Sequence, residues 1–251
     1  MLRLAILLTA LPVLAACGAT ADESAPRAAF GPLLAKLPAP AAGSLRTADG
    51  SASFVVRGNT LVRIDGRTGT EAGTIALPGR WALGGVSADG RFVALVRPGT
   101  RVLVVDVDGR RIAHRLELPG RFRVETISVG GDFLFLQQDF VDGSYAVRGY
   151  DLAAGRLLPG SLGTKGKTVK MQGRPGQVVA SPDGKWLLTL YVDTRTNTAF
   201  VHALDLIARD PNCLVLPPCD GCAPNRWKLR LAADGRTLRA TNAGEVAVFR
   251  L

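Results

Sequence analysis

A turn motif that recurs along the chain is the feature that most constrains its fold. The clearest copy is Ser181-Pro182-Asp183-Gly184, which the apolar run Trp186-Leu187-Leu188 follows. In such a turn the Asp carboxylate accepts hydrogen bonds from the amides just after it, and Gly adopts the positive φ that a tight reversal needs. Asp-Gly pairs in similar settings occur at 49–50, 89–90 and 234–235. Four copies between alternating apolar runs predict a chain of repeated β-hairpins.

Two further markers recur with a longer period. Leu-Pro-Gly begins at Leu77, Leu118 and Leu158, which gives spacings of 41 and 40 residues. An acidic residue closes an apolar strand-like run at four places, namely Asp65, Asp106, Asp151 and Asp205. A period near 40 residues suits a repeat unit of four antiparallel strands.

Together, these turns and strand ends resemble the repeats of TolB-like and YVTN-type β-propeller lipoproteins of the bacterial envelope. The resemblance implies an all-β fold over residues 31–251: a five-bladed β-propeller with four-stranded antiparallel blades. We expect the blades at about 43–79, 80–120, 121–165 and 168–220, with the longest insertion between the fourth blade and the fifth. The fifth blade begins near Asn225 and has only three strands before the chain stops.

The short fifth blade would leave an unpaired strand edge, which propellers commonly cover with a strand from the other terminus. Residues 33–38, Leu-Leu-Ala-Lys-Leu-Pro, are similar to Arg115-Leu116-Glu117-Leu118-Pro119 at the end of the second blade. We therefore expect residues 31–38 to supply the missing strand and to close the ring.

Residues 1–16 predict a lipoprotein signal peptide. Arg3 precedes an apolar run, 4–14, that is too short for a comfortable membrane span. The run ends in Leu14-Ala15-Ala16-Cys17, which resembles a bacterial lipobox and implies cleavage before Cys17 and lipid on Cys17. An ordinary secretory signal is the alternative. We expect residues 17–30 to be a flexible tether and the protein to be lipid-anchored in the cell envelope, facing the periplasm or the exterior, on either membrane.

The formal net charge of +10 bears on the partners. Nucleic acid is one explanation of such a charge, but an exported lipoprotein seldom meets it, so we expect no nucleic-acid partner. An anionic membrane surface or an acidic envelope polymer fits better, and a solvated arginine-rich surface is the third explanation. We expect a monomer.

Arginines precede the first strand of several expected blades. Pro-Gly-Arg-aromatic occurs at 78–81 and 119–122, Pro-Asn-Arg-Trp occurs at 224–227, and Arg174 lies nine residues before Asp183 as Arg80 does before Asp89. Guanidinium groups bind planar anions bidentately. We predict a rim that holds an anionic ligand or an acidic partner segment, formed by Arg80, Trp81, Arg121, Phe122, Arg174, Arg226 and Trp227. The alternative has the arginine stems packed over aromatic rings wedged between blades.

Three cysteines, Cys213, Cys219 and Cys222, cluster near the start of the fifth blade. In an exported protein they favour one disulfide, with three pairings open, and a reactive thiol is an alternative. The Cys219-x-x-Cys222 spacing resembles a redox motif but lacks the helix that would lower a thiol pKa. A zinc site would need a fourth ligand, so we expect no metal site.

No motif in the sequence marks catalytic residues or a cofactor site. His114 and His202 lie in apolar runs, where a packed or surface role is expected rather than that of a ligand, and turn geometry explains most carboxylates. We therefore expect a non-catalytic platform for a protein partner or an anionic ligand. The alternative is a propeller hydrolase acting on envelope or extracellular carbohydrate, which would need two or three carboxylates in the channel. The acids without an expected turn role are Glu125, Asp139, Asp142, Asp193 and Glu245.

Overall fold

The computed structural model describes residues 43–98, 100–193, 195–218 and 223–251. Within these ranges the chain forms nineteen strands and one short 3-10 helix. The strands make five antiparallel sheets, numbered 1 to 5 in chain order, with four strands in each of sheets 1 to 4 and three in sheet 5. No helix of the described residues is long and apolar enough to cross a membrane.

Each sheet is a meander in which strands adjacent in sequence are hydrogen-bonded neighbours. Sheet 1 comprises β1 (Leu45–Arg46), β2 (Ala52–Arg57), β3 (Thr60–Asp65) and β4 (Glu71–Ala76). Sheet 2 comprises β5 (Ala82–Val86), β6 (Phe92–Arg97), β7 (Arg101–Asp106) and β8 (Arg111–Glu117). Sheet 3 comprises β9 (Phe122–Ile127), β10 (Phe133–Asp139), β11 (Tyr145–Asp151) and β12 (Arg156–Leu157).

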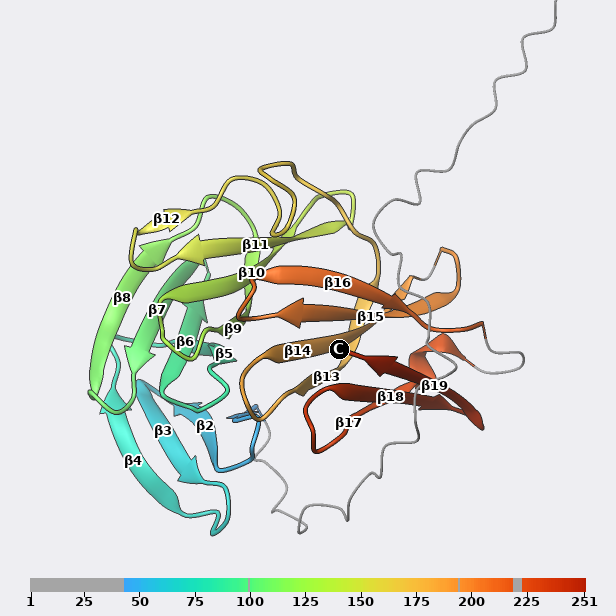
Figure 1. Ribbon diagram of the computed structural model, residues 1–251. Coiled ribbons are helices and arrows are strands. Elements are labelled where there is room, and N and C mark those ends of the chain that lie inside the picture. Colours follow the sequence, from blue (N-terminus) through green and yellow to red (C-terminus); the bar gives the residue numbers. More distant parts are fainter. Residues whose placement is uncertain (1–42, 99, 194, 219–222) are drawn as a thin grey trace, which may run out of the picture.

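Sheet 4 comprises β13 (Arg174–Ala180), β14 (Trp186–Asp193), β15 (Thr198–Asp205) and β16 (Asp210–Val215). The 3-10 helix η1 (Pro224–Arg226) precedes sheet 5, which comprises β17 (Lys228–Leu231), β18 (Thr237–Asn242) and β19 (Glu245–Arg250). Figure 1 shows the sheets following one another around a common centre, with β4 and β8 on the outside. The expected count of five sheets, the last with three strands, is confirmed for the described residues.

In sheets 1 to 4 the turn motif closes its hairpin through a hydroxyl as well as through an Asp. In the clearest copy Ser181 Oγ donates to Asp183 Oδ1 at 2.6 Å and accepts the Trp186 N–H at 2.7 Å. Sheet 3 has Gly130-Gly131-Asp132 in place of Asp-Gly, yet forms the same turn: Ser128 Oγ donates to Asp132 Oδ1 at 2.6 Å, and Gly131 takes a φ of 70°. The serine, rather than the position of the Asp, is therefore what the turns of sheets 3 and 4 share.

The core lies between consecutive sheets. Four apolar clusters fill the interfaces between sheets 1 and 2, 2 and 3, 3 and 4, and 4 and 5. In β6, for example, Val93 and Leu95 face sheet 1, whereas Phe92 and Ala94 face sheet 3. A strand buried on both faces reads as a continuous apolar run, which explains the Val- and Leu-rich segments of the sequence. No such cluster joins sheets 5 and 1 within the described residues.

Several expectations fall outside the described residues: the signal peptide at 1–16, Cys17, the tether at 17–30 and the closing strand at 31–38. One expectation about loops is wrong. The longest connection runs from Leu158 to Gly173, between sheets 3 and 4, and not between sheets 4 and 5. This connection folds on itself, because Ser161 Oγ accepts the Val169 N–H at 2.9 Å and Ser161 N–H donates to the Lys167 carbonyl at 2.7 Å.

Candidate functional site

The predicted rim residues lie at the start of the first strand of sheets 2 to 5. Arg174 and Phe122 begin β13 and β9, Arg80 and Arg121 lie just before β5 and β9, and Arg226 ends η1. The four arginines are exposed, Trp81 and Phe122 are half-buried, and Trp227 is buried. None of the ion pairs among the described residues involves Arg80, Arg121, Arg174 or Arg226.

An arginine does pack over an aromatic ring at the rim, but it is not the one expected. The guanidinium of Arg97, at the end of β6, lies 4.8 Å from the ring centroid of Trp81. Trp81 Nε1 donates to the Pro78 carbonyl at 3.3 Å, which fixes the ring. Arg80 is therefore not held by its neighbouring tryptophan, and its guanidinium has no described carboxylate partner.

Beside Trp81 lies a pocket of about 370 Å³, here called the basic pocket, whose polar character comes from Arg97, Arg101, Arg115 and Glu117. Arg97 and Arg101 stand directly opposite each other at the ends of the β6–β7 hairpin. None of the three arginines forms an ion pair within the described residues. Three cations against one carboxylate leave an excess of positive charge, which attracts an anion.

The sequence patterns do not predict the basic pocket, because its clearest mark is a pairing that only the strand register shows. Like charges directly opposite in an antiparallel pair are destabilising, so the Arg97–Arg101 pair requires an explanation. Thr100, in the turn of this hairpin, forms two hydrogen bonds with the connection into sheet 3. The Thr100 carbonyl accepts the Leu118 N–H at 3.0 Å, and the Thr100 hydroxyl donates to the Gly120 carbonyl. Arg121, a predicted rim residue, follows directly.

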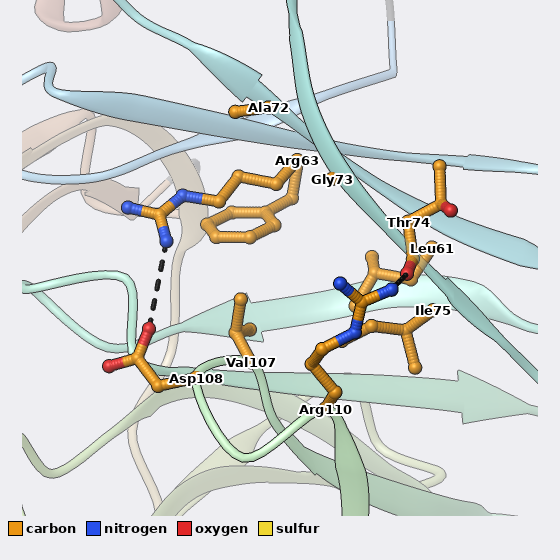
Figure 2. A pocket seen from close by; sticks show the side chains of 10 residues that line it. Leu61, Arg63, Ala72, Gly73, Thr74, Ile75, Val107, Asp108 and Arg110 are labelled. Atoms are coloured by element: carbon orange, nitrogen blue, oxygen red, sulfur yellow. Dashed lines mark hydrogen bonds and ion pairs between the residues drawn. The ribbon is translucent and has the colours of Figure 1, made fainter.

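A second pocket, of about 200 Å³, lies between sheet 1 and the β7–β8 turn (Figure 2). It also contains two arginines, but both have partners. Arg63 Nη1 lies 3.6 Å from Asp108 Oδ1, and Arg110 Nη2 donates to the Thr74 carbonyl at 3.2 Å. These contacts cross the interface between sheets 1 and 2. We interpret these contacts as structural links between sheets 1 and 2, in which both arginines already have partners.

A buried polar cluster lies between sheets 3 and 4. Glu125 is the extra residue of a bulge in β9, since Val124 pairs with Leu136 and Thr126 with Phe135. The residue as a whole is half-buried, but its Oε2 is shielded from solvent and has no hydrogen-bond partner among the described residues. Burial raises the pKa of the Glu125 carboxyl to about 7, against the opposing effects of Arg123 and of the neighbouring Tyr191 hydroxyl.

The groups around Glu125 form a chain of hydrogen bonds that crosses from sheet 4 to sheet 3. Tyr191 OH donates to Gln137 Oε1 at 2.9 Å, and Gln137 Nε2 donates to Asp139 Oδ1 at 2.9 Å. Arg123 donates to both Asp139 oxygens, at 3.0 and 2.9 Å. Asp139 is thus engaged by an arginine and an amide.

Two of the acids expected to lack a turn role have one. Asp142 Oδ1 accepts the Ser144 N–H at 3.0 Å, and its Oδ2 accepts from Lys170 Nζ at 2.9 Å. Asp193 Oδ1 accepts the Arg195 N–H at 2.9 Å. The reason is that the β10–β11 and β14–β15 hairpins use the same carboxylate-to-amide closure as the Asp-Gly turns. Glu125 is the one of the five acids whose carboxyl is enclosed without a turn or ion-pair role in the described residues.

Aromatic rings and His202 surround the same interface. Tyr145 and Tyr191 stack with centroids 4.8 Å apart, and Tyr191 meets His202 edge-on at 6.1 Å. Burial is the main cause that raises the pKa values of both phenols, and it lowers the pKa of His202 to about 4. His202 is therefore packed, as expected, and uncharged at neutral pH.

Of the three cysteines, Cys213 is buried on β16. Cys219 and Cys222 lie outside the described residues, so the disulfide stays a prediction. The described residues bring together no group of three or more His, Cys, Asp or Glu side chains that could hold a metal ion.

Comparisons with known proteins add little to this geometry. No protein-family model matches the sequence, and no curated protein matches it. Among solved structures, the chain is similar to Kuenenia stuttgartiensis hydrazine synthase, with 19% identity and a TM-score of 0.48 over 79% of this chain and 54% of that one. It is also similar to the β-propeller domain of Myceliophteria thermophila Cps50 (Swd1), with 14% identity and a TM-score of 0.45 over 83% of this chain and 64% of that one. The chain thus spans less than two thirds of either protein, and at these TM-scores neither likeness carries an argument about this one.

Proposed function

We propose that this protein is a non-catalytic binding platform of the bacterial cell envelope, and that its basic pocket takes an anionic ligand bearing a carboxylate or phosphate group. The observation that carries the proposal is the set of three arginines around one pocket without an ion-pair partner among the described residues. Guanidinium groups at such a site offer paired N–H donors to a planar anion. The exposed rim arginines, Arg80 and Arg121, add positive charge beside it.

The basic pocket is suited to binding an anion because its arginines form no ion pair among the described residues and because paired strands carry them. Arg97 is held over Trp81, whereas Arg101 and Arg115 are exposed and stand on the paired strands β7 and β8. Strands hold side chains more precisely than loops do, so the donors are preorganised. In contrast, the arginines in the pocket of Figure 2 are already engaged by Asp108 and Thr74.

The alternative of a carbohydrate hydrolase finds less support. A glycosidase needs two carboxyl groups facing one another across the substrate. Glu125 has the raised pKa expected of an acid, but Asp139 is bound by Arg123 and Gln137, and Asp142 and Asp193 close hairpins. One carboxyl without a partner favours a binding role for this fold.

The proposal also covers how the five sheets are arranged and how the protein is held at the membrane. We propose that the five sheets are blades of one β-propeller, that residues 31–38 complete sheet 5, and that lipid on Cys17 holds the domain at the membrane through the tether at 17–30. The apolar clusters that fill four of the five sheet interfaces support the ring. The platform would present the basic pocket to the envelope without a transmembrane helix.

The ligand proposal is tested by titrating the purified chain with inorganic phosphate and citrate while replacing arginines in pairs. Arg101→Gln with Arg115→Gln is expected to weaken binding at least about tenfold, since hydrogen bonds to charged groups are worth roughly 1.5–3 kcal/mol each. The matched control is Arg67→Gln with Arg156→Gln, which removes the same charge from exposed residues elsewhere. Equal loss in both pairs would mean that net charge, and not the basic pocket, attracts the anion.

A third pair of substitutions, Arg80→Gln with Arg226→Gln, distinguishes binding at the predicted rim from binding at the basic pocket. If the rim binds the anion instead, this pair loses affinity while Arg101→Gln with Arg115→Gln retains it. Melting temperatures are measured for every pair. A large fall in melting temperature for the rim pair would identify Arg80 and Arg226 as clamps between sheets.

A further inference from the structure

The last strand of sheet 2 has one edge without a described partner. β8 is hydrogen-bonded to β7 on one side, and no other described strand pairs with it. Figure 1 shows β8 on the outside of the molecule. Its residues Arg111, Arg115 and Glu117 are exposed. An open edge of this kind can hydrogen-bond to the backbone of an added strand.

The strand register shows which backbone groups of β8 point outward. The Leu118 N–H donates to the Thr100 carbonyl at 3.0 Å, so the backbone of this pair faces the β6–β7 hairpin. Hydrogen-bonded and non-hydrogen-bonded pairs alternate along an antiparallel ladder. Leu116 therefore also faces β7, whereas Arg115 and Glu117 direct their N–H and carbonyl groups away from it. These groups are the donors and acceptors that an added strand would meet.

The side chains beside this edge favour an acidic strand. In the pairing with β7, Arg115 is opposite Leu103 and Glu117 is opposite Arg101. Leu103 packs in the apolar cluster between sheets 1 and 2, and residues two positions apart on a strand share a face. Arg101, Arg115 and Glu117 therefore lie on that face, where they line the basic pocket. A residue added opposite Arg115 would have its Cβ about 5 Å from that of Arg115, so a carboxylate there can reach the guanidinium group.

The other outer strands of sheets 1 to 4 are less suited to such pairing. β8 has seven residues, against six in β4 and β16 and two in β12. β16 contains Pro211, which has no N–H to donate. In β4 the one charged residue is Glu71, which forms an ion pair with Arg57. β8 thus combines the longest outer strand with an adjoining excess of positive charge.

We propose that an extended acidic segment of a partner protein adds to β8 as a fifth strand of sheet 2, with a carboxylate side chain bound by Arg101 and Arg115. The basic pocket is the anion site of the proposed function, on which this proposal rests, and its anion is then an Asp or Glu side chain. Backbone hydrogen bonds to β8 supply affinity, and the arginines select acidic segments. A second copy pairing through its own β8 is a poorer occupant, because both strands carry the same arginines.

The probe is a fluorescent, end-capped octapeptide of alternating glutamate and threonine, and anisotropy measures its binding to the full chain. Glutamates opposite Arg115 direct their amides toward β8, and the threonine amides point away. Methylating the glutamate amide nitrogens should weaken binding at least about tenfold, because each lost hydrogen bond is worth roughly 0.5–1.5 kcal/mol. Methylating the threonine amides is the matched control and should leave binding unchanged. A peptide with glutamine in place of glutamate should also bind at least about tenfold more weakly.

The matching variants test the side chains. Arg101→Gln with Arg115→Gln should weaken binding of the octapeptide at least about tenfold, and Arg67→Gln with Arg156→Gln, at exposed positions elsewhere, should bind as the wild type does. Equal affinity of the glutamate and glutamine peptides would overturn the proposal, because charge would then select nothing.

Amide hydrogen exchange measured by NMR gives a readout that needs no variant. The Arg115 and Glu117 amides should exchange rapidly in the chain alone and at least about tenfold more slowly when the octapeptide is bound. The Leu116 amide, which faces β7, is the internal control and should be protected in both states. If Arg115 and Glu117 are already protected without peptide, the edge is covered by this chain or, where sedimentation shows a dimer, by a second copy, and the proposal is wrong.

Two outcomes separate this proposal from the proposed function. If both methylated peptides bind as the unmodified one does, or if citrate binds and the octapeptide does not, the basic pocket takes anions without strand addition. The fifth strand is then overturned while the proposed function stands. If neither citrate, phosphate nor the octapeptide binds, both are overturned.

Discussion

The side-chain amide of Gln177 forms two hydrogen bonds with the backbone of Leu229, one from each end. Gln177 Nε2 donates to the Leu229 carbonyl at 3.0 Å, and Gln177 Oε1 accepts the Leu229 N–H at 2.9 Å. Gln177 lies in the bulge of β13, and Leu229 in β17, so the amide joins the first strands of sheets 4 and 5 as a neighbouring strand would. It is a direct polar link between these two sheets.

We expect Gln177→Leu to lower the free energy of unfolding by about 1–2 kcal/mol, because Leu229 loses both partners. Urea denaturation measures the change. Gln172→Leu is the control, since the side chain of Gln172 forms no hydrogen bond among the described residues. If both variants cost the same, the loss comes from adding an apolar side chain and not from breaking the link.

The enclosed carboxyl of Glu125 predicts how stability depends on pH. Burial raises its pKa from 4.5 to about 7, and the charged or titratable groups that face it are Arg123, Asp139, Tyr145 and Tyr191. Between these pH values the folded chain holds a proton that the unfolded chain has released. Glu125 therefore contributes stability at low pH that is lost as pH rises from about 4.5 to 7, by at most about 3 kcal/mol.

Glu125→Gln should remove this loss. We expect the variant and the wild type to have similar stability at pH 5, and the variant to be more stable at pH 8, when both are unfolded with urea across the range. Glu117→Gln, at an exposed carboxyl, is the control and should follow the wild type. The same pH slope in Glu125→Gln and the wild type would show that another group causes it.

The fold was largely predictable because its signals are local. The Asp-Gly turns and the strand-closing Asp residues act within a few residues, as when Asp65 Oδ1 accepts the Arg67 and Thr68 N–H groups at 2.9 and 2.8 Å. The turn of sheet 3 showed the limit of reading Asp-Gly alone, since Ser128 preserves the turn while Asp132 shifts by two positions. Counting the serine as part of the motif would have found it.

The sites were less predictable because they depend on register and bulges. Strand limits alone do not show that Arg97 stands opposite Arg101. A register shift of one residue would turn these side chains to the other face of the sheet. The bulge that encloses Glu125 is likewise a property of the pairing with β10 and leaves no mark in the local sequence. The repeats in the sequence predicted arginines at the starts of the first strands, where the structure has them. They did not predict the neighbouring hairpin arginines, Arg97 and Arg101.

The lipobox leads to a prediction about location. Replacing Cys17 by Ser removes the thiol that lipid would modify, so we expect the protein to leave the membrane fraction or to accumulate with its signal peptide uncut. Fractionation and mass spectrometry of the N-terminus check this, with Cys213→Ser as a control that keeps Cys17. Membrane association and processing identical to the wild type would contradict lipid anchoring through Cys17.

The last prediction concerns the strand that sheet 5 lacks. Among the described residues β19 is an edge strand, and Val246 on it is 46% exposed. Each interface between consecutive sheets, from sheet 1 to sheet 5, contains an apolar cluster, but the described residues form none between sheets 5 and 1. A strand carrying Leu33, Leu34 and Leu37 would pair with the edge and supply apolar side chains at that gap.

Two truncations distinguish the contribution of this strand to stability from that of the tether. Deleting residues 18–29 removes only the predicted tether and should leave the melting temperature nearly unchanged. Deleting residues 18–40 should destabilise the domain severely, because each fully buried apolar side chain that is lost costs about 1.5–3 kcal/mol, in addition to the backbone hydrogen bonds of the edge. Equal melting temperatures would mean that residues 31–38 do not close the ring, and that the edge of β19 is left for another chain to cover.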